Sequence, residues 1–173
     1  TRKESSAASD VYKRQDVTMK NPFTISNNVT PAMIDHNGHV HDANYNMVFS
    51  EAINQFNYTH GLSLEERTKL NYTLFTVEEQ TAYLSELTED DTFTITIYIY
   101  DYNEKSLHFF SVMTDQDGNN IATNEAMMLG IDRTINKTAP FPQSFADQIS
   151  NYYDNQQLIE WPKQLGHKIG ISR

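Results

Sequence analysis

The sequence predicts a two-layer α+β domain, in which one long helix packs against one face of an antiparallel sheet. Apolar residues recur between positions 43 and 60 with the spacing of an amphipathic helix; they are Tyr45, Val48, Phe49, Ala52 and Phe56. The segment "TFTITIYIYDY" (92–102) alternates apolar and polar residues, which is typical of a half-buried strand. Because the helix stripe and the apolar strand face must both be covered, we expect the two layers to pack on one another.

The remaining elements follow in order along the chain. Residues 23–30 are expected to form a short strand that ends before Pro31. The long helix is expected to begin at an N-cap, Asp42, and to stop at Gly61. The other predicted elements are a helical turn over 63–69, strands over 74–87, 92–102, 105–115 and 121–132, and a helix over 143–159. The turn sequence "DQDGNN" (115–120) separates the last two strands.

Composition narrows the class of protein. The chain has 173 residues and a mass of 20.0 kDa, which suits one domain with a hydrophobic core. It has no cysteine, which excludes disulfides, thiolate metal sites and a cysteine nucleophile. Its net charge of −10 argues against nucleic acid and anionic membranes as partners. We find no apolar run of the ~20 residues that a membrane span needs and no secretory signal, so we expect a cytoplasmic location.

The chain is expected to divide into three segments. Residues 1–18 are small, polar and charged, and "SAASDVYKRQ" resembles translated adapter sequence. Since Met19 is a natural start, we expect this segment to be non-native or a disordered tail. Residues 19–137 are expected to form the folded domain. Residues 138–173 are expected to form a C-terminal extension of loop, helix and tail that packs on this domain or on a second copy.

One polar stretch, "IDHNGHVHDANY" (34–45), allows three interpretations. The first is a metal site made by His36, His39 and His41, but the spacing H-x-x-H-x-H matches no metal signature, and we expect none. The second is a structural loop. Asn37-Gly38 is a hairpin-turn sequence, but here a helix follows instead of a second strand.

The third interpretation is catalysis by Asp35. This residue lies seven positions before the expected N-cap, so the loop can fold its carboxylate back over the helix N-terminus. Backbone N–H groups and the positive end of the helix dipole there can polarise a carbonyl. A carboxylate beside such a site supplies what acyl transfer needs, namely a base or nucleophile and electrostatic help for developing negative charge.

The stretch "DHNGHVHDANY" (35–45) resembles the active-site loop of hotdog acyl-CoA thioesterases of the 4-hydroxybenzoyl-CoA thioesterase type, in which a pattern like D-x-x-G-H-V-N-N-x-x-Y leads into the central helix. The resemblance places Asp35 on the catalytic aspartate, Gly38 on the glycine and Tyr45 on the helix-entry tyrosine. It implies a hotdog fold, with the sheet wrapped around one central helix. The sequence departs from the family at Met33, where a second acidic residue is frequent.

Further segments resemble one branch of that family, the betainyl-CoA thioesterases of carnitine breakdown. They are "FTVEEQTAYLSEL" (75–87), "EKSLHFF" (104–110), "IATNEAMMLGID" (121–132) and "WPKQLGHKIGI" (161–171). Gln80, Ser106 and Gly130 depart from this branch, which carries histidine, arginine and histidine there. The resemblance therefore implies hydrolysis of a small acyl-CoA, and the departures leave the acyl group open.

The resemblance also implies roles for other residues. Asp35 either attacks the thioester carbonyl or activates water, and Asn37, His39 and Glu78 are the other catalytic candidates. Glu78 and Glu79 must face opposite sides of a strand, and only the resemblance favours Glu78. The expected substrate-binding residues are Gly38, Asp42, Ala43, Asn44, Tyr45, Phe49, His108 and Glu125.

Two rival functions and the partners complete the expectations. A hotdog enoyl-CoA hydratase shares Asp35, Asn37 and Asp42, but Gly38 and Val40 replace its proline and histidine. A non-catalytic hotdog protein that binds acyl-CoA is the other rival. No cofactor is expected beyond the coenzyme A of the substrate. Because hotdog domains commonly pair their sheet edges, the resemblance implies a homodimer or homotetramer.

Overall fold

The computed structural model describes residues 21–173, so the prediction made for residues 1–18 lies outside the described residues. Its elements are β1 (Phe23–Asn28), a 3-10 turn η1 (Pro31–Met33), α2 (Asp42–Thr59), α3 (Leu64–Leu70), β2 (Tyr72–Tyr83), β3 (Thr92–Tyr102), β4 (Ser106–Asp115), β5 (Asn120–Asp132), β6 (Lys137–Thr138) and α4 (Gln143–Asn155). The strands pair antiparallel in the order β1-β3-β4-β5-β2, and β6 adds to β5.

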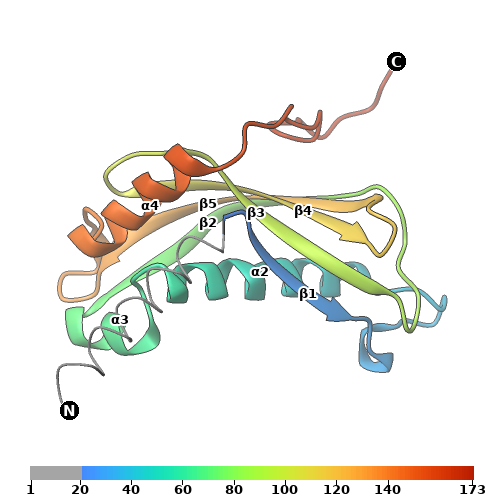
Figure 1. Ribbon diagram of the computed structural model, residues 1–173, viewed down its shortest axis with the longest axis horizontal. Helices are drawn as coiled ribbons and strands as arrows, with labels where there is room; N and C mark the ends of the chain where they lie inside the picture. Colours follow the sequence, from blue (N-terminus) through green and yellow to red (C-terminus); the bar gives the residue numbers. More distant parts are fainter. Residues whose placement is uncertain (1–20) are drawn as a thin grey trace, which may run out of the picture.

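The sheet curls around α2, which runs along its concave face (Figure 1). Phe49 and Phe56 of α2 are completely buried, as are the alternate residues Ile95, Ile97 and Ile99 of β3. Removing each of these side chains from water contributes about 1.5–3 kcal/mol, so the helix stripe and the strand face together form the core. A sheet wrapped around a central helix is the hotdog arrangement, and this confirms the predicted fold.

The two ends of α2 are decided by local chemistry. The sequence analysis expected Asp42 as the N-cap, but the N-cap is His41, whose ring accepts a hydrogen bond from the Ala43 N–H, and Asp42 is the first helical residue. Adjacent residues with side-chain acceptors compete for this position, and only the backbone angles select one. At the other end, Gly61 has φ +108° immediately after the C-cap, which confirms it as the helix stop.

Strand β2 is shorter than expected. It ends at Tyr83 instead of Leu87, because the N–H groups of Leu84 and Ser85 both turn to the Ile121 carbonyl, at 2.9 and 3.1 Å. The register of β2 against β5 also shifts between Thr76 and Glu78. This irregularity is a β-bulge, which changes the face to which the following residues point.

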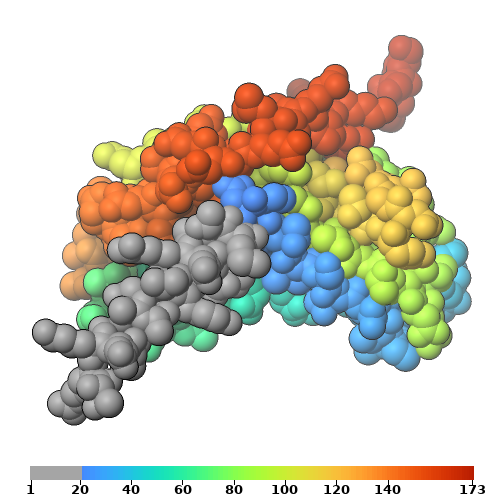
Figure 2. Space-filling view, viewed as in Figure 1, coloured from blue at the N-terminus to red at the C-terminus, as the bar shows by residue number. Residues whose placement is uncertain are grey.

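The C-terminal extension consists of α4, whose Tyr152 packs against Phe56 near the C-terminal end of α2, and a tail over the face of the sheet opposite α2 (Figures 1 and 2). The helix ends at Asn155 and not at 159, because Gln156 turns its amide onto β3. Its Nε2 donates to the Ile99 carbonyl at 2.7 Å and its Oε1 accepts from the Ile99 N–H at 3.0 Å. Further along, Trp161 packs edge-on against Tyr98 and Tyr100. None of the described helices is both long and apolar enough to cross a membrane.

Candidate active site

The loop before α2 is a closed turn. The Asp35 N–H donates to the His39 carbonyl at 2.9 Å, and the Gly38 N–H donates to the Asp35 carbonyl at 3.1 Å. Gly38 has φ +77°, which an L side chain rarely adopts. Contrary to the sequence-based interpretation, Asn37-Gly38 therefore closes a tight turn even though a helix follows it, because Ile34 and Val40 form an antiparallel bridge just outside the turn.

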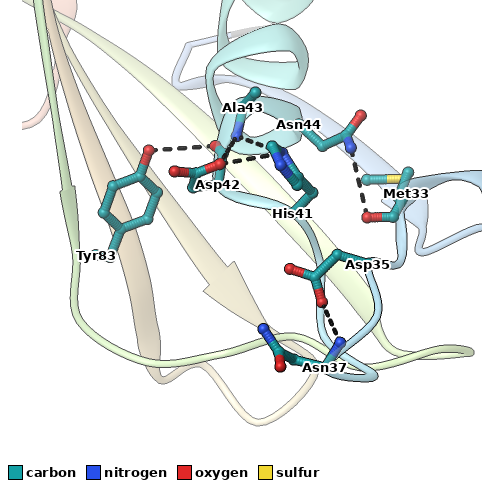
Figure 3. Close-up of polar contacts among 8 residues, drawn as sticks. All are labelled: Met33, Asp35, Asn37, His41, Asp42, Ala43, Asn44 and Tyr83. Carbon is teal, nitrogen blue, oxygen red and sulfur yellow. Dashed lines mark hydrogen bonds and ion pairs between the residues drawn. The ribbon is translucent and has the colours of Figure 1, made fainter.

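The turn holds the Asp35 carboxylate at the start of α2. Asp35 Oδ1 accepts a hydrogen bond from the Asn37 N–H at 2.8 Å (Figure 3), an Asx turn that fixes the side chain. Asp35 is half-buried as a residue. It lines a cleft of about 440 Å³, whose walls are Asp35, His36, Asn37, His39, Val40, His41, Asp42, Tyr45, Tyr83, Ser85 and Glu86. Asp35 and the first turn of α2 therefore line one cavity.

The helix N–H groups that were expected to hold a carbonyl oxygen already have acceptors. The Ala43 N–H donates to His41 Nδ1 at 3.1 Å and to Asp42 Oδ1 at 2.8 Å (Figure 3). The Asn44 N–H donates to the His41 carbonyl at 2.9 Å. The side chains of His41 and Asp42 are 52% and 74% exposed. Because both are free to rotate into solvent, a ligand oxygen can replace them at Ala43. As the first helical residue, Asp42 has no intrahelical acceptor for its own N–H.

The other wall is shaped by Tyr83 of β2, Tyr45 of α2 and His39 of the loop. The Tyr83 hydroxyl donates to the Asp42 carbonyl at 3.2 Å (Figure 3), and the Tyr45 hydroxyl accepts from the Leu87 N–H at 3.1 Å. The two phenol rings meet edge-on at 5.4 Å. Burial raises the pKa of both phenols, so both remain neutral near pH 7. His39 also faces this wall, where its Nε2 lies 3.2 Å from Glu86 Oε2.

Several predicted site residues lie elsewhere. Phe49 is fully buried in the core and does not line the cleft. His108 and Glu125 lie on the face opposite α2, where His108 Nε2 is 3.5 Å from Glu125 Oε2 and both Glu125 oxygens accept from the Gly166 N–H at 2.9 Å. Together with Glu78 and Glu79 they line a separate recess of about 120 Å³ at the β2 edge. The structure therefore does not bring Glu78, His108 and Glu125 to the Asp35 cleft of the same chain.

The β-bulge in β2 decides which glutamate faces α2. After the bulge Glu78 opposes Met127, while Glu79 opposes Ala126 of the core. Glu79 Oε1 accepts from Asn124 Nδ2 at 3.1 Å. The inward residue is thus Glu79, not Glu78, and a bulge of this kind leaves no mark in the residue pattern from which it could have been predicted. Among the described residues no group of three histidine, aspartate or glutamate side chains is placed to hold a metal ion.

Comparison with known proteins assigns the family. The model of the thioesterase-like superfamily matches residues 29–149, a span that contains the Asp35 loop, α2 and strands β2 to β6. The chain belongs to this superfamily. The finding confirms the predicted family and the predicted class of enzyme, a thioester hydrolase.

Individual relatives are similar over most of their length. A hypothetical protein from Staphylococcus aureus, solved in complex with CoA, is 57% identical with a TM-score of 0.86, covering 87% of this chain and 95% of that chain. A betainyl-CoA thioesterase of Pseudomonas aeruginosa is 26% identical over 83% of this chain and 91% of its own. A 1,4-dihydroxy-2-naphthoyl-CoA thioesterase from Synechocystis shares the fold, with 18% identity and a TM-score of 0.68 over 75% of this chain and 96% of that chain.

Proposed function

We propose that this protein hydrolyses short acyl-CoA thioesters at the Asp35 cleft. The observation that carries the proposal is that the Asp35 carboxylate and the N-terminus of α2 line one cavity. Support for CoA as the carrier comes from the Staphylococcus aureus relative, which was solved in complex with CoA. Hydrolysis by a carboxylate and water uses no redox or metal chemistry, so we propose that the enzyme requires no cofactor.

In this mechanism Asp35 acts on the thioester carbonyl, either directly as the nucleophile or as the base that activates water. The Asx turn with Asn37 keeps the carboxylate oriented. The loop is open at Gly38, since a Cβ there would meet nothing within 4 Å. The carbonyl oxygen accepts from the Ala43 N–H after His41 and Asp42 rotate away. One such donor typically contributes a factor of ~10²–10³ in rate.

The acyl group we propose is betainyl. The Pseudomonas aeruginosa relative is named for betainyl-CoA, and the cleft offers two phenol rings, Tyr45 and Tyr83. Aromatic faces attract quaternary ammonium groups, and the net charge of −10 favours a cationic ligand over an anionic one.

We also propose that the enzyme works as a homodimer, or as a homotetramer built from it, through the β2 edge. Strand β2 ends the described strand order, so one side of its backbone lacks a sheet partner. Phe75 and Val77 on this strand are 47% and 55% exposed, and a long apolar edge strand is a template for pairing with another copy. Tyr83 belongs both to this strand and to the cleft, so the partner would lie beside the site. Light scattering should give two or four times 20.0 kDa; a monomer contradicts the proposal.

The test is release of free thiol from a panel of acyl-CoAs, for the wild type, Asp35→Asn and Asp117→Asn as a matched control on an exposed turn. Asparagine retains an oxygen that can accept from the Asn37 N–H, so the fold should survive. Loss of the carboxylate should lower kcat by ~10²–10⁴, and Asp117→Asn should leave it unchanged. Undiminished thiol release by Asp35→Asn would contradict the assignment. Hydration of enoyl-CoA without free thiol would select the hydratase instead.

A further inference from the structure

A row of polar side chains crosses the concave face of the sheet beside the cleft. Ser111 of β4 opposes Asn124 of β5, which opposes Thr81 of β2. Ser111 and Asn124 are 0% and 1% exposed, and Thr81 is half-buried. Burying polar groups costs free energy unless they are hydrogen-bonded, so a row of them in an otherwise apolar core requires an explanation.

The hydrogen bonds of this row run toward the start of α2. Asn124 Nδ2 donates to Glu79 Oε1 at 3.1 Å and to Thr81 Oγ1 at 3.0 Å. The Thr81 hydroxyl in turn donates to Asn46 Oδ1 on α2. Because a carboxylate can only accept, Glu79 determines which end of the Asn124 amide faces it. The Asn124 amide in this row therefore holds one oxygen of the Glu79 carboxylate in place.

An inventory of donors and acceptors shows what the row lacks. Both N–H groups of the Asn124 amide and the O–H of Thr81 are used within it. Among the described residues, the buried atoms Asn124 Oδ1 and Ser111 Oγ have no hydrogen-bond partner. Glu79 keeps its second oxygen and its charge, and the residue is exposed. Because Asn124 and Ser111 are buried, what the row presents to a ligand is the negative charge of Glu79.

The row ends at Asn46 in α2, near the helix start where the thioester is expected. Asn46, which receives the Thr81 hydrogen bond, is four residues after Asp42 on α2, and this spacing is about 6 Å along a helix. Tyr83 of the cleft wall is two residues beyond Thr81 on β2, which places their side chains on the same face. Glu79 is not one of the residues that line the Asp35 cleft, but its charge helps to raise the pKa of the Tyr83 phenol in the cleft wall, so the same charge acts on a group bound beside Tyr83.

We propose that Glu79, held by Asn124, is the specificity-determining residue for the acyl group, and that it selects short acyl chains that carry a positive charge. This inference rests on the proposed thioesterase function and adds to it a residue outside the Asp35 loop. The negative charge of Glu79 complements a cation, whereas it repels a carboxylate and gains little from an alkyl chain.

The test compares two substrates that differ in charge but hardly in shape. They are betainyl-CoA and 3,3-dimethylbutanoyl-CoA, in which carbon replaces the quaternary nitrogen. The measured quantity is the ratio of their kcat/KM values. The variants are Glu79→Gln, which removes the charge and keeps the shape, Glu78→Gln on the opposite face, and Glu104→Gln in the exposed turn after β3 as the matched control. Circular dichroism checks that each variant is folded.

In the wild type we expect betainyl-CoA to be preferred about tenfold or more. Glu79→Gln should remove that preference, mainly through KM for betainyl-CoA, while turnover of the neutral substrate stays within about twofold; Glu104→Gln should retain the preference. A preference that persists in Glu79→Gln, or that is lost in Glu78→Gln instead, overturns the inference.

The wild-type ratio tests the inference without any variant. Equal turnover of both thioesters overturns the selection of cations and leaves the thioesterase proposal intact. No release of thiol from any acyl-CoA overturns the proposed function and the inference with it.

Discussion

The hydroxyl of Tyr152 on α4 connects the first two strands of the sheet, and its removal tests this part of the fold. The hydroxyl accepts from the Phe23 N–H of β1 at 2.9 Å and donates to the Ile97 carbonyl of β3 at 2.6 Å. Phe23 and Ile97 are opposed in the register of these strands. Tyr152→Phe leaves the ring in its contacts with Phe56 and His60 but takes a hydrogen-bond partner from two buried backbone groups.

Each buried group left without its partner costs about 1–3 kcal/mol. Tyr152 is only 4% exposed, so water cannot readily replace the hydroxyl, and we expect a loss of about 2–4 kcal/mol. This is a large part of the ~5–15 kcal/mol by which a domain is stable. With a slope of ~2 kcal/mol/M, it should lower the urea midpoint by about 1–2 M.

The assay is urea unfolding followed by circular dichroism at one protein concentration. Tyr153→Phe is the matched control, because its side chain is on the same helix and 39% exposed; it should change stability by less than about 0.5 kcal/mol. If Tyr152→Phe is as small in effect as this control, the hydroxyl does not connect the strands as described.

Three other predictions concern stability and the tail. Burial raises the pKa of Tyr152 from 10 to about 12. The stability that comes from its neutral phenol is therefore complete below pH ~10 and is lost as the pH rises through 12, by ~1.4 kcal/mol per pH unit. Urea midpoints between pH 9 and 12 should fall less steeply in Tyr152→Phe than in the wild type, and equal slopes would contradict this. Gly130→Ala should cost about 1–3 kcal/mol, since its Cβ would lie 1.7 Å from the Tyr72 hydroxyl; a wild-type urea midpoint would refute that clash. Glu125→Ala should free the tail at Gly166 and shift the emission of Trp161, the only tryptophan, to longer wavelength, and an unchanged spectrum would show that the tail is held without Glu125.

The local pattern of residues was enough to predict the elements and the fold class. The alternation through β3 and the apolar stripe of α2 each repeat over ten or more residues, so many side chains report the same period. The motif around Asp35 likewise lies within one loop, and its cleft with the start of α2 depends on a few neighbouring residues. Patterns of this kind involve residues close together in the chain, so they can be recognised in a single sequence.

What depended on single residues or on register was decided only by the tertiary structure. His41 rather than Asp42 caps α2 because of backbone angles at one residue. One β-bulge in β2 turns Glu79 toward α2 and Glu78 away from it, since one extra residue exchanges the two faces of a strand. Asn124 meets Glu79 and Thr81 across 45 and 43 residues of chain. Such contacts exist only after the strands have paired, and no local period in the sequence encodes which residues the pairing will bring together.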